Sequence, residues 1–169
     1  MIKYKIKHTG VKMGEFKTNV MRMLDKAKIK YKHYSYADTD AISGVEVAIA
    51  LNQDPNRVFK TLVTVAKSGN HYVFMIPAEK ELDLKASAHA VSEKSIEMLK
   101  SKELLPLTGY VHGGCSPIGM KKPFKTIVDK SALNFETIMF SAGKIGYQVE
   151  VSPLDLEKII HVDFSKITD

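Results

Sequence analysis

The sequence has a single cysteine, Cys115, so an intramolecular disulfide cannot staple the fold. It also lacks an apolar run of the ~20 residues that a membrane span needs, and the N-terminus lacks the apolar segment and cleavage site of a signal peptide. We therefore expect a cytoplasmic protein without membrane contact. A chain of 169 residues, 44% of them hydrophobic, is long enough for one domain with a core and too short for two.

Motifs for metals and nucleotides are missing as well. The six histidines show no paired spacing such as HxxxH, and one cysteine cannot complete a structural zinc site. The glycines form neither GxxxxGK[ST] nor GxGxxG, so neither a P-loop nor a dinucleotide-binding fold is supported. The sequence therefore implies no metal and no cofactor.

Arginine is scarce: only Arg22 and Arg57 occur, so bidentate recognition of bases or phosphates would be sparse. The formal net charge is nevertheless +6, and residues 1–33 carry ten Lys and Arg against Glu15 and Asp25. A basic end on a near-neutral body favours contact with a polyanion. A solvated, lysine-rich surface explains the same charge equally well.

Local signals predict two helices and a hairpin in the first half. Thr18 can cap a helix whose apolar residues repeat at intervals of three and four, and Ser43 with Glu46 has the pattern of a capping box. Residues 57–66 and 71–77 are β-branched runs on either side of a turn, which predicts a β-hairpin.

The second half is expected to hold a helix, three strands and a final helix. Residues 92–105 are in broadly helical register and Pro106 is expected to end that helix. The predicted strands cover residues 124–129, 137–141 and 147–151. Ser152 is expected to cap the last helix, with Pro153 in its first turn. Because helices and hairpins alternate without a regular βαβ repeat, the pattern predicts an α+β fold with a mixed or largely antiparallel sheet.

Residues 107–122, LTGYVHGGCSPIGMKK, hold four of the ten glycines and the only cysteine. So much glycine predicts backbone with positive φ or backbone that lies against a ligand. Cys115 with His112 is a candidate nucleophile and base, but no papain-like or caspase-like signature surrounds the cysteine, and a lone cysteine in a glycine-rich turn is more often a packing residue. A thiol enzyme therefore stays the less favoured alternative.

Lys60 lies inside the first strand of the predicted hairpin. An ammonium there, facing the free N–H groups of Gly113, Gly114 and Cys115, would bind an anion or a developing oxyanion, which suits ester chemistry. In the structural alternative, Lys60 extends from a sheet face into solvent and the glycines only permit tight turns.

Five segments, in order along the chain, resemble the YbaK/EbsC family of bacterial Cys-tRNA(Pro) deacylases, which is related to the editing domain of prolyl-tRNA synthetase. The segments are KTNVMRMLDKAKIKY (17–31), VFKTLV (58–63), IPAEKELDLK (76–85), LTGYVHGGCSPIGMKK (107–122) and SAGKIGYQVEVSPLDL (141–156). The resemblance implies a single α+β domain over residues 17–169, with a mixed, barrel-like sheet flanked by helices. Residues 1–16 would then form an N-terminal extension.

The resemblance also implies roles for individual residues. The lysine of the VFKTL motif, Lys60, is the family's essential catalytic residue. The residues expected to bind the substrate are Tyr34, Thr61, Gly113, Gly114, Cys115, Ser116, Ser141 and Gln148. Gln148 departs from the family, in which this position is often acidic, and an amide cannot act as a base.

The reaction implied is hydrolysis of mischarged aminoacyl-tRNA, chiefly Cys-tRNA(Pro), in which the substrate's own thiol attacks the ester carbonyl. Contacts to the tRNA backbone are expected from Lys17, Arg22, Lys26 and Lys28. Prolyl-tRNA synthetase is the expected partner in a ternary complex. Two alternatives remain: a deacylase for Ala-tRNA(Pro) or another mischarged tRNA, and a non-catalytic module of the same fold that binds tRNA or a synthetase.

Overall fold

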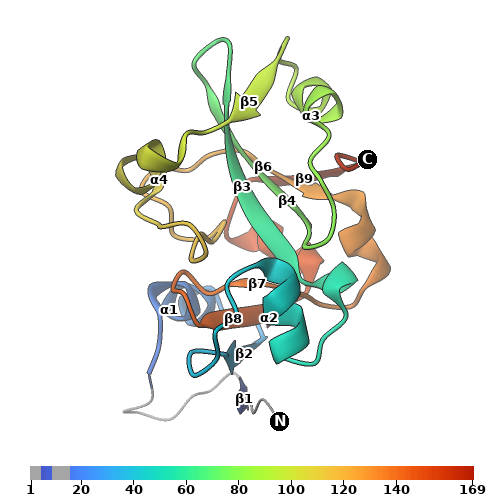
Figure 1. The fold of residues 1–169 in the computed structure, drawn as a ribbon. Helices are drawn as coiled ribbons and strands as arrows, with labels where there is room; N and C mark the ends of the chain where they lie inside the picture. Colours follow the sequence, from blue (N-terminus) through green and yellow to red (C-terminus); the bar gives the residue numbers. More distant parts are fainter. Residues whose placement is uncertain (1–4, 9–15) are drawn as a thin grey trace.

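Two β-sheets form the framework of the computed structural model, which describes residues 5–8 and 16–169 (Figure 1). The first sheet consists of β1 (Lys5–His8), β2 (Tyr31–Ser35), β8 (Tyr147–Val151) and β7 (Ile138–Ser141), in that order, and every pair is antiparallel. The second sheet consists of β5 (Ile96–Met98), β3 (Phe59–Ala66), β4 (His71–Pro77), β6 (Thr126–Asp129) and β9 (Val162–Ser165). Its β4–β6 and β6–β9 pairs are parallel, so this sheet is mixed.

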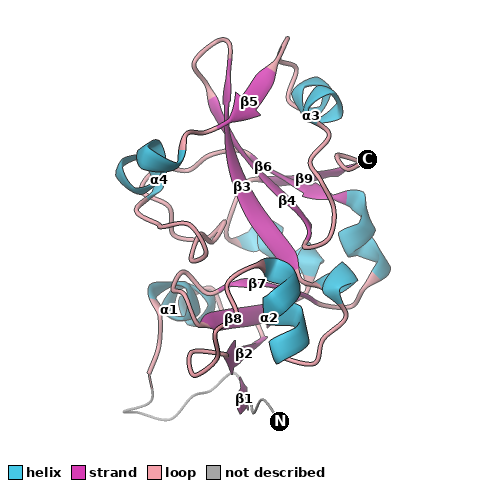
Figure 2. Cartoon of the chain, viewed as in Figure 1, coloured by secondary structure: helices cyan, strands magenta, loops and turns pink. Residues whose placement is uncertain are grey.

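Short helices lie around the two sheets (Figure 2). The α-helices are α1 (Asn19–Lys26), α2 (Gly44–Ala50), α3 (Leu84–Ala90) and α4 (Ser101–Thr108), and the 3₁₀ helices are η1 (Pro55–Arg57), η2 (Lys130–Asn134) and η3 (Pro153–Lys158). The α+β architecture expected from the sequence is confirmed.

The predicted N-caps of α1 and α2 are both present. Thr18 Oγ1 accepts a hydrogen bond from Met21 N at 3.2 Å. Ser43 and Glu46 form the complete capping box, because each side chain bonds the backbone N–H of the other at 3.1 Å. The hairpin is also confirmed: Phe59 pairs with Pro77 at its base, and the register continues to Val65 and His71.

The two sheets meet beside the first residues of β3. Val58 forms a parallel bridge with Met139 of β7, and Phe59 and Met75 of the second sheet pack in the same core cluster as Phe140 of the first. The described strands form two sheets joined at this bridge, and they do not close into a barrel. This junction positions β3 next to β7 and β8.

Two expectations for the second half of the chain were wrong, and a third holds in part. Residues 92–105 do not form one helix: β5 occupies residues 96–98, because Ile96 pairs with Ala66 of β3, and α4 begins only at Ser101. Pro106 lies inside α4, which continues to Thr108. The final helix is present as the 3₁₀ helix η3, with Ser152 at its N-cap position and Pro153 in its first turn, but the Ser152 side chain makes no capping hydrogen bond.

The N-terminal segment joins the first sheet through β1, whose residue Lys5 pairs with Ser35. The rest of the strand expected before residue 16 lies outside the described residues. None of the helices in the described part of the chain has the length and apolar character that crossing a membrane would require.

Candidate functional site

A cavity of about 500 Å³ opens along one edge of β3, between the two sheets. Residues 64–66 of this edge pair with β5, and Val58 is bridged to β7. Between these points, residues 59–63 pair with β4 on their other side but have no strand beside them on this edge among the described residues. The cavity occupies this gap, and its other walls come from α2, α4, the loop after α4, and β7 and β8.

Lys60 lines this cavity from the free edge of β3. Its side chain is partly buried, and no described carboxylate forms an ion pair with it. The residues that line the cavity include no aspartate or glutamate. The ammonium of Lys60 is therefore available to a bound molecule.

Two residues that line the cavity, Thr61 of β3 and Gln148 of β8, each have a buried polar atom without a hydrogen-bond partner among the described residues. These atoms are Thr61 Oγ1 and Gln148 Oε1. Leaving a buried polar group unsatisfied costs about 1–3 kcal/mol, so native proteins rarely keep such groups without a reason. Both residues line the same cavity, so they are candidates for contact with a polar ligand group.

The glycine-rich loop contributes only part of the predicted cradle. Gly113 has a φ of +86°, in the left-handed region that favours glycine, and lines the cavity together with Cys115. Gly114 does not line the cavity. Its N–H was expected to be free, but it donates a hydrogen bond to Val111 O at 3.0 Å. Within the loop, the amides of Gly113 and Cys115 therefore remain the candidates for contact with a ligand.

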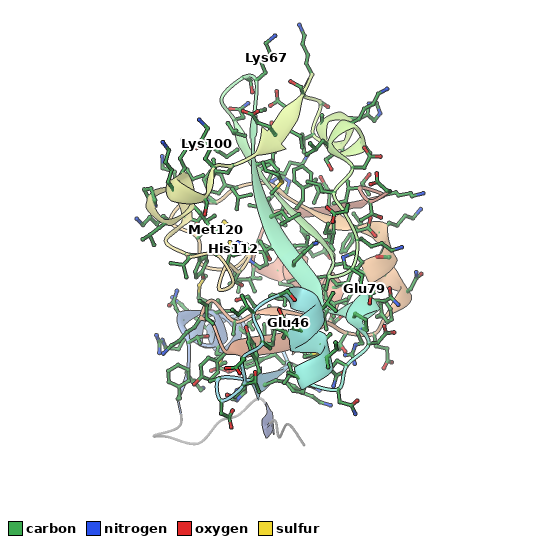
Figure 3. The ribbon with its side chains drawn as sticks, viewed as in Figure 1. Glu46, Lys67, Glu79, Lys100, His112 and Met120 are labelled. Carbon is green, nitrogen blue, oxygen red and sulfur yellow. The ribbon has the colours of Figure 1, made fainter. Side chains whose placement is uncertain are left out.

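Cys115 is a packing residue with an inert thiol. Its side chain packs against Val63 and Val73, and burial raises the pKa of the thiol to about 12. No hydrogen bond joins it to His112, which is exposed at the cavity rim (Figure 3). A nucleophilic cysteine needs a thiolate, so the environment of Cys115 argues against a thiol enzyme.

The two remaining serines predicted for the site differ in position. Ser141 lines the cavity, and its Oγ accepts a hydrogen bond from Gly143 N at 3.1 Å, which leaves its own O–H group to donate. Ser116 does not line the cavity. It is buried in the loop, where its Oγ accepts from Ile118 N at 3.4 Å.

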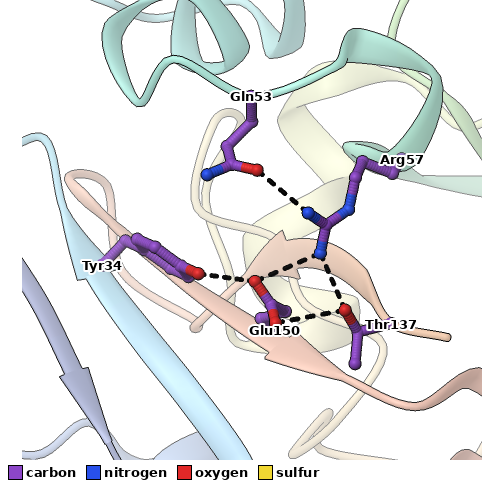
Figure 4. Close-up of polar contacts among 5 residues, drawn as sticks. All are labelled: Tyr34, Gln53, Arg57, Thr137 and Glu150. Carbon is purple, nitrogen blue, oxygen red and sulfur yellow. Dashed lines mark hydrogen bonds and ion pairs between the residues drawn. The ribbon is translucent and has the colours of Figure 1, made fainter.

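Tyr34 was expected in the pocket, but the structure places its hydroxyl elsewhere. Tyr34 Oη donates to Glu150 Oε1 at 2.5 Å, and Tyr34 does not line the cavity (Figure 4). Tyr36, two residues later, lines it instead. Tyr36 follows β2, which ends at Ser35, and the sequence analysis did not single it out.

The partner of Tyr34, Glu150, belongs to a polar network that joins the two sheets (Figure 4). Arg57 Nη2 lies 3.1 Å from Glu150 Oε1 and donates to Thr137 Oγ1 at 2.7 Å, while Nη1 donates to Gln53 Oε1 at 3.0 Å. Burial alone would raise the pKa of Glu150, but the hydrogen bonds from Tyr34 and Thr137 and the charge of Arg57 outweigh it and hold this pKa below its ordinary value. The sequence analysis missed this network.

The residues expected to contact tRNA lie on or beside α1. Arg22, Lys26 and Lys28 are exposed, so their charges are open to solvent. Lys17 differs, because its Nζ forms an ion pair with Asp25. Among the described residues, no three His, Cys, Asp or Glu side chains lie close enough together to hold a metal ion.

Comparison with known proteins places most of the chain in one group. Residues 39–159 match the model of the aminoacyl-tRNA editing domain. The chain is 44% identical over 158 residues to the "Putative Cys-tRNA(Pro)/Cys-tRNA(Cys) deacylase EbsC" of Enterococcus faecalis, covering 93% of this chain and 96% of that protein.

More distant similarities agree. The chain is 24% identical over 110 residues to proline--tRNA ligase of Lactobacillus helveticus, covering 65% of this chain and 19% of the ligase. The crystal structure of "a putative trans-editing enzyme for prolyl tRNA synthetase" has the same fold, with a TM-score of 0.76 and 21% identity, and the match covers 90% of this chain and 98% of that one.

Proposed function

The chain belongs to the aminoacyl-tRNA editing domain family, and from this premise we propose that it is a trans-editing deacylase that hydrolyses mischarged aminoacyl-tRNA, chiefly Cys-tRNA(Pro). The observation that carries the proposal is the ammonium of Lys60, which has no ion-pair partner within residues 5–8 and 16–169 and lines a cavity to which those residues contribute no carboxylate. The similarity over nearly the full chain to the relative of Enterococcus faecalis supports the choice of substrate. We place the reaction in the cytoplasm, with protein synthesis.

An aminoacyl ester is already activated, so the site needs only to orient it and to stabilise developing charge. Lys60 Nζ and the amides of Gly113 and Cys115 donate to the ester carbonyl as it becomes an oxyanion. The substrate thiol attacks this carbonyl: an S–C bond forms, the ester C–O bond breaks, and the thiol proton goes to the departing ribose oxygen. Water then opens the cyclic thioester and releases cysteine.

In this mechanism Cys115 takes no covalent part. Tyr36, Ser141 and the α2 N-terminus at Ser43 shape the cavity around a small aminoacyl group. Shape alone discriminates about 10–200-fold for a methylene-sized difference, and the need for a substrate thiol adds a chemical filter. Alanine has no thiol, so Ala-tRNA(Pro) would be a poor substrate.

The exposed cations Arg22, Lys26 and Lys28 would contact the tRNA backbone, where they position the substrate without reading its sequence. The choice of tRNA would then come from a partner. Prolyl-tRNA synthetase is that partner in our proposal, and the similarity of this chain to a segment of a proline--tRNA ligase supports it.

Deacylation assays with Cys-tRNA(Pro), Cys-tRNA(Cys) and Ala-tRNA(Pro), each with and without prolyl-tRNA synthetase, test the proposal. We expect Cys-tRNA(Pro) to be hydrolysed fastest and the synthetase to increase the preference for tRNA(Pro). Faster release of alanine would overturn the choice of substrate. No hydrolysis of any of them, with tRNA binding retained, would identify a non-catalytic binding module.

Lys60→Ala tests the site itself. The variant should fold and lose turnover by about 100-fold or more, since it removes an oxyanion donor. The matched control is Lys67→Ala, which removes an exposed lysine at the tip of the same hairpin (Figure 3). Equal activity of the two variants would show that Lys60 is not catalytic.

A further inference from the structure

Thr61 and Gln148 both line the proposed substrate cavity, and each has an unused acceptor, Thr61 Oγ1 and Gln148 Oε1. Both are buried without a hydrogen-bond partner among the described residues, and they come from different sheets, β3 and β8. Ser87 Oγ is another buried hydroxyl for which the described part of the chain offers no partner, but it lies on α3 and does not line the cavity. Burial alone therefore does not explain why two such atoms share one site.

The charges and donors of the cavity restrict what the two acceptors can bind. An aminoacyl ester has one group with several N–H donors, its α-ammonium, and the cavity lining includes no carboxylate to receive it. A threonine hydroxyl and a glutamine carbonyl both accept hydrogen bonds. The Thr61 hydroxyl and the Gln148 carbonyl can therefore bind the α-ammonium as uncharged acceptors, in place of a carboxylate.

The positive charge of Lys60 fixes the orientation of the substrate. Lys60 and Thr61 are consecutive residues of a strand, so their side chains point to opposite faces. An α-ammonium near Lys60 would be repelled, whereas the ester carbonyl would be attracted. The carbonyl therefore lies toward Lys60 and the ammonium toward Thr61 and Gln148.

On this geometry, and resting on the deacylase function proposed above, we infer that Thr61 and Gln148 recognise the free α-ammonium of the aminoacyl group. The site is then selective for an unblocked amino group as well as for the side chain. A tRNA whose amino acid is N-acylated, as in peptidyl-tRNA, lacks this ammonium and is spared. This selectivity protects growing peptide chains from the same enzyme that clears mischarged tRNA.

The decisive comparison is between Cys-tRNA(Pro) and 3-mercaptopropionyl-tRNA(Pro), which keeps the thiol and the ester but has no amino group. We expect the kcat/KM of the wild type to be lower for the second substrate by at least about 100-fold, because sites built for a hydrogen-bonding group reject analogues that lack it. Both values are corrected for the uncatalysed hydrolysis of each ester. Equal corrected values would overturn the inference while leaving the deacylase function intact.

Variants assign the effect to the two acceptors. Thr61→Val keeps the shape of the side chain but removes the hydroxyl, and Gln148→Met removes the amide. Each variant should reduce kcat/KM for Cys-tRNA(Pro) about 10- to 100-fold and should change kcat/KM for the mercaptopropionyl substrate little. Thr61→Ser and Gln148→Glu keep an acceptor and should preserve the preference. Ser87→Ala is the matched control, since it removes a buried, unpartnered hydroxyl outside the cavity.

A binding measurement keeps the inference separable from the reaction. Calorimetry with 3′-cysteinylamido-adenosine, which is not hydrolysed, and its mercaptopropionyl counterpart should show tighter binding of the first in the wild type. The difference should shrink in Thr61→Val and Gln148→Met. If Cys-tRNA(Pro) is not hydrolysed but this difference is found, the proposed reaction fails and the ammonium site stands; if both substrates and both variants behave alike, the ammonium site fails.

Discussion

Arg57 Nη2 lies 3.1 Å from Glu150 Oε1 of β8. Arg57 directly precedes Val58, which forms the bridge between the two sheets, so the ion pair lies next to that bridge. Glu150 is two residues from Gln148 on β8, so their side chains share one face of the strand. The pair therefore fixes the two walls of the cavity relative to each other. We expect changes in it to alter both stability and the geometry of the site.

Arg57→Met should lower the free energy of unfolding by about 3 kcal/mol, because the carboxylate of Glu150 would remain buried without its partner. The double variant Arg57→Met/Glu150→Met should lose less than the sum of the two single variants, since it removes both charges. Urea denaturation measures all three. The exposed Lys67→Met should change the free energy of unfolding by no more than about 0.5 kcal/mol; additive losses at Arg57 and Glu150 would contradict the coupling.

The lowered pKa of Glu150 makes stability depend on pH in the acid range. A carboxyl whose pKa is lower in the folded state stabilises the protein above its unfolded pKa, and this stability is lost as pH falls through the folded pKa. The ordinary pKa is 4.5, so the loss begins near this pH and continues below it. Urea midpoints measured from neutral pH to about pH 3 should fall more steeply for wild type than for Glu150→Gln. Parallel curves would exclude Glu150 as a contributor.

The buried thiol of Cys115 should react slowly. With a pKa of about 12, roughly one thiol in 10⁴ is ionised at pH 8, so alkylation by iodoacetamide should be far slower in the folded protein than in urea. Cys115→Ala should keep deacylation within a few-fold of wild type. Loss of turnover in a folded Cys115→Ala variant would restore the thiol-enzyme alternative.

A side chain at Gly143 would be unfavourable for two reasons, its backbone conformation and its close neighbours. Its φ is +86°, and a Cβ added there would lie 2.9 Å from Val20 Cγ2 and 3.1 Å from Tyr110 Cε1. Gly69 has a φ of +93° with no atom within 4 Å of an added Cβ, so Gly69→Ala isolates the backbone cost of about 1–2 kcal/mol. Gly143→Ala should cost more than this in urea denaturation. Equal losses would show that the contacts with Val20 and Tyr110 relax freely.

The basic face of α1 should affect tRNA binding without affecting chemistry. Replacing Arg22, Lys26 and Lys28 together by Glu should raise KM for Cys-tRNA(Pro), leave kcat near wild type, and reduce the dependence of KM on salt, because fewer counterions are released on binding. Lys67→Glu, at the far hairpin tip, is the control. An unchanged KM would remove α1 from the proposed tRNA surface.

Local signals predicted the parts of the fold that depend on local interactions. The caps at Thr18 and Ser43 and the hairpin around residues 67–70 each involve residues close in the sequence, and all three are present. The strand β5 was missed because only its pairing with β3 defines it, and Ile96 and Leu99 fit a helix equally well. Pro106 fits inside α4 because it and Lys102, whose carbonyl loses its N–H partner, are both exposed to water.

The composition of the cavity depended on tertiary contacts that the sequence does not encode locally. The resemblance to a family identified Lys60, Thr61, Ser141 and Gln148, and the structure brings all four to one cavity. It named Tyr34 for the cavity, which Tyr36 lines instead, because the contact of Tyr34 with Glu150 depends on the pairing of β2 with β8. The roles of these residues, and the division of the chain at residue 16, remain predictions.

The free edge of β3 has a consequence for the order of folding. The β3–β4 hairpin is local and can form in microseconds, but the cavity also needs β7 and β8, which follow much later in the chain. A chain emerging from the ribosome would therefore present Lys60 long before Gln148. Such a nascent chain carries the lysine that we propose to be catalytic but no cavity around it, so we expect it to stay inactive toward aminoacyl-tRNA until its last strands are made.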